Sequence, residues 1–234
     1  MKSTSLTQNV KIPRIYLSIA LGCILFVVLT SIAMLTYSGG SYEDHAAPGY
    51  SFTHNFFSDL GRVTAQSGRP NWFSAVLFFI ALSIAGASLV IFFILFQRLF
   101  RHGHLQHLLC LLGSAFGVLA GISFIGVAFS PADLALPAHA QFVIWAFRLF
   151  PLAVLCYVIA LFLDRDYPRR YAWVFAIFCL LLIGYYLLMT HGPEFASPQG
   201  LVIQAVGQKV IVYASILSIG VQSFGANRFL TMRQ

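Results

Sequence analysis

The sequence predicts an all-α membrane protein, a bundle of six membrane-spanning helices in one domain that covers residues 1–234. Of the 234 residues, 59% are hydrophobic and only 9% are charged, a composition outside the range of soluble globular proteins. In addition, six apolar runs reach the length of about 20 residues that a helix needs to cross a bilayer core. The runs are residues 15–37, 72–97, 107–129, 138–163, 171–190 and 199–223.

The first run follows Lys2, Lys11 and Arg14, as the apolar part of a secretory signal would. However, it is longer than a typical signal segment, and the sequence after it ("TYSGGSYEDHAAPGY") has no clear small-x-small cleavage site. We interpret it as a retained first helix.

The orientation follows from the basic residues, because short cytoplasmic loops of membrane proteins collect Lys and Arg. With the N-terminus in the cytoplasm, only Arg62 and Arg69 lie outside. The cytoplasmic side then carries Lys2, Lys11, Arg14, Arg98, Arg101, Arg165, Arg169, Arg170, Arg228 and Arg233. Both termini are therefore expected in the cytoplasm. This bias and contact with anionic lipid headgroups account for the net charge of +7, so a nucleic-acid partner is not expected.

The first external loop, from about Ser38 to Asn71, is far longer than the other connections, and loops of this length usually have a function or structure of their own. Aromatic and apolar residues recur between Tyr50 and Leu60 close to helical spacing, and Gly61 is suited to a helix C-cap. We therefore expect a short amphipathic helix in this external loop.

The third run has Gly113, Gly117 and Gly121 at four-residue spacing. Small residues at this spacing let another membrane helix approach closely. We interpret the stripe as a packing surface, with the second run around Gly86 as its partner.

Two cations lie inside predicted spans, Arg148 in the fourth run and Lys209 in the sixth, where Gln204 and Gln208 add polar groups. A cation at the centre of a bilayer is costly, and none of the six runs contains an acidic residue to pair with it. One interpretation is an outward-opening polar cavity, lined by these four residues, that binds an anionic lipid headgroup or another small anion. The alternative is structural: Lys209 and the glutamines bond to neighbouring helices while Arg148 reaches toward the interface.

Several reactive side chains fall at the predicted outer face: His54, Ser58, Asp59, Asp133 and His139. His54, Asp59, Asp133 and His139 are candidate ligands for a zinc ion that activates water. Ser58 is a candidate nucleophile, with His54 or His139 as base and Asp59 as orienting acid. The chain contains no HExxH, HxxxH or GxSxG motif, so neither pattern is specific.

Each of these residues also has a structural interpretation. Ser58 or Asp59 can cap a short helix, and Asp133 can cap the turn after Pro131. Asp59 can also pair with Arg62, or reach inward to a buried cation. In that case the segment "HNFFSDLGR" is a lid over the bundle.

Three short stretches carry a resemblance to a known group: "HNFFSDLG" (54–61), Pro70–Asn71 and "PADLALPAH" (131–139). With the six-span pattern, the chain resembles bacterial six-helix membrane proteins of a domain of unknown function, allied to the eukaryotic Frag, DRAM and Sfk families. The resemblance implies a six-helix bundle with cytoplasmic termini in the bacterial inner membrane. The allied eukaryotic proteins are linked to lipid remodelling, lipid asymmetry and membrane trafficking. The resemblance transfers no catalytic residue.

From these observations we expect an integral membrane protein that binds or handles a membrane lipid or another amphiphile, without catalysis or a cofactor of its own. The alternative is a metal-dependent outer-face hydrolase or transferase that acts on a lipid headgroup with zinc. A transporter is a weaker alternative, because the two halves of the chain show no matching pair of broken helices.

Overall fold

The computed structural model describes residues 4–100 and 103–233, with side chains from residue 12 onward. Lys2, Arg101 and the Lys11 side chain, which the orientation argument uses, lie outside the described part. The long helices are α1 (Thr4–Thr36), α2 (Trp72–Phe96), α3 (His104–Ala128), α4 (Leu136–Leu163), α5 (Arg169–His191) and α6 (Pro198–Thr231). Two short 3-10 helices, η1 (Phe57–Gly61) and η2 (Gln97–Leu99), complete the secondary structure, and the described residues form no β-strand.

The structure confirms an all-helical chain whose six long helices match the six predicted runs. All six are long and apolar enough to cross a membrane, which is the architecture of a multi-pass membrane protein. The largest boundary differences are at the start of α1, which begins at Thr4 although the apolar run was predicted from 15, and at the end of α6, which continues to Thr231 although the run was predicted to stop at 223. A helix satisfies its backbone hydrogen bonds internally, so it continues past the point where the sequence ceases to be apolar.

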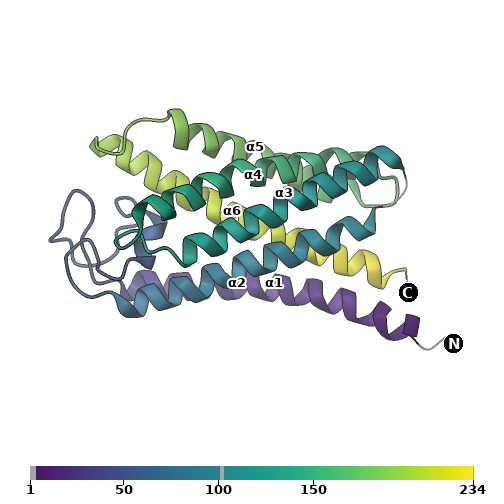
Figure 1. Ribbon diagram of the computed structural model, residues 1–234, viewed down its shortest axis with the longest axis horizontal. Helices are drawn as coiled ribbons and strands as arrows, with labels where there is room; N and C mark the ends of the chain where they lie inside the picture. The colour runs from purple at the N-terminus through teal and green to yellow at the C-terminus, as the bar shows by residue number, and fades with distance from the viewer. Residues whose placement is uncertain (1–3, 101–102, 234) are drawn as a thin grey trace.

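The six helices form a closed ring. Each long helix packs against the next one in the sequence, and α6 packs against α1. Both termini lie at the same end of the bundle, on the right in Figure 1, and the segment between α1 and α2 lies at the other end. We call these the terminal end and the loop end.

Close approach of α2 and α3 explains the glycine stripe. A Cβ atom on Gly86 would lie 2.9 Å from the Gly121 carbonyl oxygen, and one on Gly121 would lie 2.9 Å from the Gly86 carbonyl oxygen. Real Cβ atoms do not approach other atoms so closely, and any larger residue would therefore push the helices apart. The predicted packing role is confirmed, and α2 is the partner of Gly121, which meets Gly86, and of Gly117, which meets the Phe93 ring. Gly113 instead faces Tyr157 and the Ala153 carbonyl oxygen on α4.

The interior of the terminal half is filled by aromatic rings. Phe92, Phe93, Phe96, Tyr157 and Phe175 are all fully buried there. Their ring centroids lie 4.6–6.4 Å apart in the contacting pairs, mostly in edge-on or tilted arrangements that favour aromatic packing. The loop half is built differently, and it contains the candidate site.

Candidate functional site

The segment between α1 and α2, residues 37–71, folds over the loop end of the ring, and we call it the cap (Figure 1). It is held by polar side chains rather than by regular secondary structure. Asn71, which is buried, accepts a hydrogen bond from Ser38 N (3.2 Å) and donates to Arg62 O (2.8 Å). At Gly40 the chain reverses with φ of +82°, and a Cβ atom there would meet Ser67 N at 2.2 Å, so only glycine fits.

Within the cap, the predicted amphipathic helix over 50–60 is shorter than expected. Only Phe57–Gly61 is helical, in a five-residue 3-10 turn, and Phe56 before it is extended. Side-chain oxygens accept hydrogen bonds from the backbone amides in place of helix carbonyls: Asp59 Oδ2 accepts from Phe56 N (2.9 Å), and Asn55 Oδ1 accepts from Ser51 N (2.9 Å). Such local bonds compete with helix formation. Gly61 is not the predicted C-cap: it is the last residue of the turn, the cap residue is Arg62, and Gly61 does not have a positive φ. Glycine is needed there for space instead, because a Cβ atom would meet the Phe78 ring at 2.5 Å.

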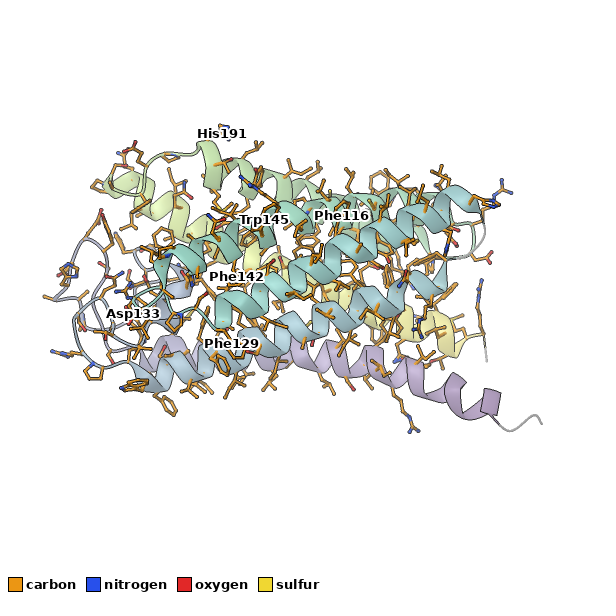
Figure 2. All side chains as sticks on the ribbon, viewed as in Figure 1. Phe116, Phe129, Asp133, Phe142, Trp145 and His191 are labelled. Atoms are coloured by element: carbon orange, nitrogen blue, oxygen red, sulfur yellow. The ribbon has the colours of Figure 1, made fainter. Side chains whose placement is uncertain are left out.

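Asp133, on the connection between α3 and α4, fastens the cap from outside the segment. Its carboxylate accepts hydrogen bonds from the backbone amides of Val63 (3.1 Å) and Thr64 (2.8 Å). Figure 2 shows Asp133 at the edge of the cap. The predicted turn-capping role after Pro131 is therefore replaced by a longer-range one, in which two cap amides occupy both carboxylate oxygens.

Lys209 on α6 is fully buried and points into the cap. Its ammonium donates to the backbone oxygen of Asn55 and, at 2.9 Å, to that of Ala205. The rings of Tyr50 and Phe52 lie 5.5 and 5.2 Å from the nitrogen, within the range of cation–π attraction. The buried cation is therefore satisfied by backbone carbonyls of the cap and of its own helix and by aromatic rings, rather than by a neighbouring helix as the structural alternative expected.

Asp59 is the buried acid of the cap. Asn55 Nδ2 (3.2 Å), Phe56 N (2.9 Å) and Gln66 Nε2 (3.3 Å) all donate to its carboxylate. It forms no ion pair within 4 Å with another described residue, although it is close enough to Lys209 for their charges to interact. Burial raises the pKa of the Asp59 carboxyl above its ordinary value of 3.8, against the lowering effects of the Asn55 hydrogen bond and of Arg62.

This raised pKa gives the cap a defined pH dependence. Between the pKa of an unfolded aspartate and the raised pKa of folded Asp59, the folded state binds more protons, so the free energy of unfolding falls as the pH rises. We expect Asp59→Asn to remove this fall. Thermal unfolding in detergent across a pH series checks it, with Asp44→Asn, an exposed acid of the same cap, as the control. An unchanged pH dependence in Asp59→Asn would contradict the assignment.

The candidate catalytic residues do not meet one another. His54 Nδ1 lies 3.1 Å from Ser51 Oγ and 2.8 Å from Thr53 Oγ1, while His139 Nδ1 donates to Ser130 O (2.6 Å). Ser58 Oγ has no hydrogen bond to His54, to His139 or to any other described residue. The predicted serine, histidine and aspartate constellation is therefore not assembled in this structure.

The residues proposed for zinc are also used elsewhere. His54 and His139 have the partners given above, Asp133 binds two cap amides, and Asp59 accepts three hydrogen bonds. In residues 4–100 and 103–233, no group of three or more His, Cys, Asp or Glu side chains lies close enough to hold a metal ion. The zinc alternative stays a prediction.

The four polar residues predicted to share a cavity point in different directions. Arg148 is exposed and donates to the Tyr186 hydroxyl on α5 (3.3 Å), whereas Lys209 is enclosed by the cap. Gln204 Nε2 donates to Leu188 O (2.9 Å) and Pro193 O (3.2 Å) at the end of α5 and the connection after it. Arg148 and Lys209 therefore do not line one cavity in this structure, because Arg148 is exposed beside α5 and Lys209 is buried under the cap.

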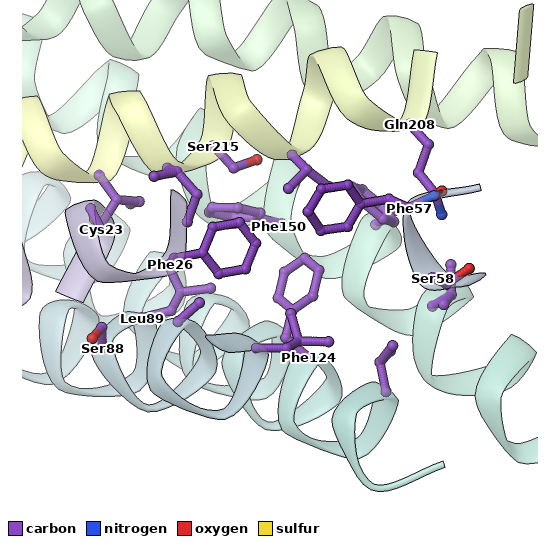
Figure 3. A pocket seen from close by; sticks show the side chains of 18 of the residues that line it. Cys23, Phe26, Phe57, Ser58, Ser88, Leu89, Phe124, Phe150, Gln208 and Ser215 are labelled. Atoms are coloured by element: carbon purple, nitrogen blue, oxygen red, sulfur yellow. Dashed lines mark hydrogen bonds between the residues drawn. The ribbon is translucent and has the colours of Figure 1, made fainter. Parts of the chain in front are cut away.

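Gln208 remains beside an internal space. Its Oε1 accepts from Phe57 N (2.6 Å), which fixes the 3-10 helix η1 to α6. Its Nε2 has no hydrogen-bond partner among the described residues, so the amide group still has donors to offer. Figure 3 shows Gln208 and Ser58 with Phe57 between them at one end of this space.

The space itself is a cavity of about 90 Å³ in the loop half of the ring. Helices α1, α2, α3, α4 and α6 line it, and α5 contributes no side chain. Its wall is almost wholly apolar and includes Phe26, Leu82, Phe147 and Val212. The buried Phe57 ring closes the loop end and packs against Phe26, Phe78 and Tyr213, with centroids 5.8–5.9 Å apart. The expected polar cavity is therefore replaced by an apolar one with polar groups at its rim.

Comparison with models of protein families, with curated proteins and with solved structures found no match. The site therefore rests on its own geometry. Sequence reasoning missed Asn55, Phe57 and Asn71, the residues that build and close the cap. Two features of the sequence could have pointed to them. Phe57 is a large apolar residue within a polar external segment, and Asn55 and Asn71 are asparagines in a loop of over thirty residues.

Proposed function

We propose that this protein binds the apolar chain of a membrane lipid or of another amphiphile in the cavity beneath the cap. The observation that carries the proposal is the unfilled apolar centre of the ring in its loop half. Protein interiors are close-packed, and the aromatic cluster of the terminal half shows that this ring is filled where no space is needed. Apolar molecules reach a cavity inside a membrane-spanning bundle from the bilayer itself.

The polar end of the bound molecule is proposed to lie at the rim, near Gln208 and Ser58. The free Gln208 Nε2 donor and the Ser58 hydroxyl suit an uncharged oxygen such as that of an ester or a hydroxyl group. Lys209 would not contact the molecule, because carbonyl oxygens and aromatic rings already surround its ammonium. Its role in the proposal is to hold the cap.

We infer in addition that the termini are cytoplasmic and that the cap faces outward from a bacterial inner membrane. The charge distribution supports this orientation. The connections at the loop end carry Arg62 and Arg69, whereas the described cations at the other end are Arg14, Arg98, Arg165, Arg169, Arg170, Arg228 and Arg233. The bacterial setting rests on the resemblance of the sequence alone.

Filling the cavity tests the proposal. Ala85 lines it, whereas Ala87, two residues further on the same helix, is exposed on the outside of the bundle. We expect Ala85→Phe to abolish retention of a bound amphiphile, because the new ring occupies its space, and Ala87→Phe to retain it. Lipid extraction and mass spectrometry of protein purified in mild detergent measure the amount bound per chain.

Circular dichroism and thermal unfolding separate displacement from misfolding. If Ala85→Phe does not fold, Val212→Phe fills the same cavity from α6. Equal amounts of bound amphiphile in the wild type and in a folded, cavity-filled variant would refute the proposal.

A further inference from the structure

A second pocket lies at the terminal end, away from the cap and the cavity. It is formed between the first turn of α5 and the last turns of α6 and has a volume of about 430 Å³. Among the residues that the structure describes, three arginines line it, Arg170, Arg228 and Arg233, together with one acid, Asp166. The described lining residues thus carry three positive formal charges and one negative charge.

Within residues 4–100 and 103–233, only one of these three arginines forms an ion pair. Arg233 Nη2 lies 2.6 Å from Asp166 Oδ2, and its guanidinium carbon lies 4.2 Å from the centre of the Phe229 ring. Arg170 is exposed above the Tyr171 ring, at 5.0 Å from its centre, and has no acidic partner among the described residues. The same holds for Arg228. Two guanidinium groups at the mouth of one pocket therefore have donors available.

The rest of the lining is apolar and includes Tyr171, Phe229 and Met232. Gly225 leaves room for the Tyr171 ring, which a Cβ atom would meet at 2.5 Å. The pocket thus joins a cationic mouth to an apolar wall at one end of two membrane-crossing helices. That end is where the phosphate groups of a bilayer lie, above their acyl chains.

We infer that this pocket binds the phosphate group of an anionic phospholipid. Guanidinium groups match phosphate oxygens in geometry, and basic pockets between membrane helices recruit acidic lipid headgroups. The Tyr171, Phe229 and Met232 side chains contact the glycerol and the first carbons of the chains. This site is separate from the amphiphile cavity and does not depend on it.

The test uses the full chain in nanodiscs that contain phosphatidylcholine with a minor fraction of phosphatidylglycerol. Native mass spectrometry of the protein released from them measures which lipid stays bound. We expect the wild type to retain phosphatidylglycerol preferentially and Arg170→Gln/Arg228→Gln to reduce this preference by roughly tenfold or more. The matched control is Arg165→Gln/Arg169→Gln, which removes two exposed arginines of the same end that do not line the pocket. It should keep the preference.

A second arm identifies the source of the phosphate. Titration of inorganic phosphate into protein in pure phosphatidylcholine nanodiscs should give no binding that depends on Arg170 and Arg228 if the site needs a lipid. Binding that the Arg170→Gln/Arg228→Gln variant loses would keep the phosphate site but assign it to the free ion. Equal losses of phosphatidylglycerol in the two double variants would show that a diffuse basic surface attracts the lipid, and this would overturn the inference. No loss in either variant would overturn it as well.

Discussion

Replacing Lys209 by methionine is expected to lower the free energy of unfolding by about 3 kcal/mol, because a buried acceptor left without its donor costs about 1–3 kcal/mol and an uncompensated buried charge costs more. The substitution keeps an unbranched side chain of similar length. However, it leaves the Asn55 carbonyl without its donor and Asp59 without its nearby cation. Replacing a buried cation by an apolar residue can stabilise a protein when its partners are replaced too, but here they remain in place.

The matched control is Arg148→Met, the same change at the other cation within a span. Arg148 is exposed and has one hydrogen bond of 3.3 Å, so its loss should cost about 1 kcal/mol or less. Thermal unfolding in detergent should show a melting temperature lower by roughly 6–12 °C for Lys209→Met and by only a few degrees for Arg148→Met. Equal shifts would mean that Lys209 does not anchor the cap.

Truncation of Phe57 to alanine is expected to be as damaging or more so, at about 3–5 kcal/mol. The ring is almost fully buried, and it joins the cap to α1, α2 and α6 through its contacts with Phe26, Phe78 and Tyr213. The space that it leaves would also merge with the cavity, so neighbouring side chains cannot easily collapse into it.

Phe56 supplies the control for this truncation. It is the preceding residue of the same cap, but it is only partly buried, and its ring packs against Phe195, which follows α5. Phe56→Ala should cost less than half as much as Phe57→Ala in the same unfolding measurement. Similar losses for the two variants would show that general apolar contact of the cap matters, rather than closure of the ring by Phe57.

The helices could be predicted from the sequence because their signal is local. An apolar run of the length of a membrane crossing specifies a helix almost regardless of what surrounds it, since the chain must satisfy its own backbone inside a bilayer. The contact of Gly86 with Gly121 was predictable for a related reason: four-residue spacing puts small side chains on one face of a helix.

The cap and its partners could not be predicted, because they depend on contacts between distant segments. The cost of burying Lys209 indicates that it needs a partner, but that partner is the Asn55 carbonyl, 154 positions away. Arg148 and Lys209 are similar in sequence context, yet one is exposed and the other fully buried. The difference depends on which face of each helix points to the interior of the bundle. A similar position along two helices does not specify this face.

The cavity was also outside the reach of sequence reasoning. It is the volume that the side chains of five helices and η1 together leave unfilled. The sequence of any one helix does not show that such a volume exists. Small residues such as Ala85, Ser88 and Ser215 on its wall contribute to the space, but small residues also mark close packing, as Gly86 does on the same helix as Ala85. Only the assembled ring distinguishes the two.

An experimental structure of the protein in lipid nanodiscs would test the central claim most directly. The proposal predicts elongated density in the cavity, which begins beside Gln208 and Ser58 and continues between Phe26 and Phe147. A well-ordered map in which neighbouring side chains fill this space, or in which no density lies between the helices there, would contradict it.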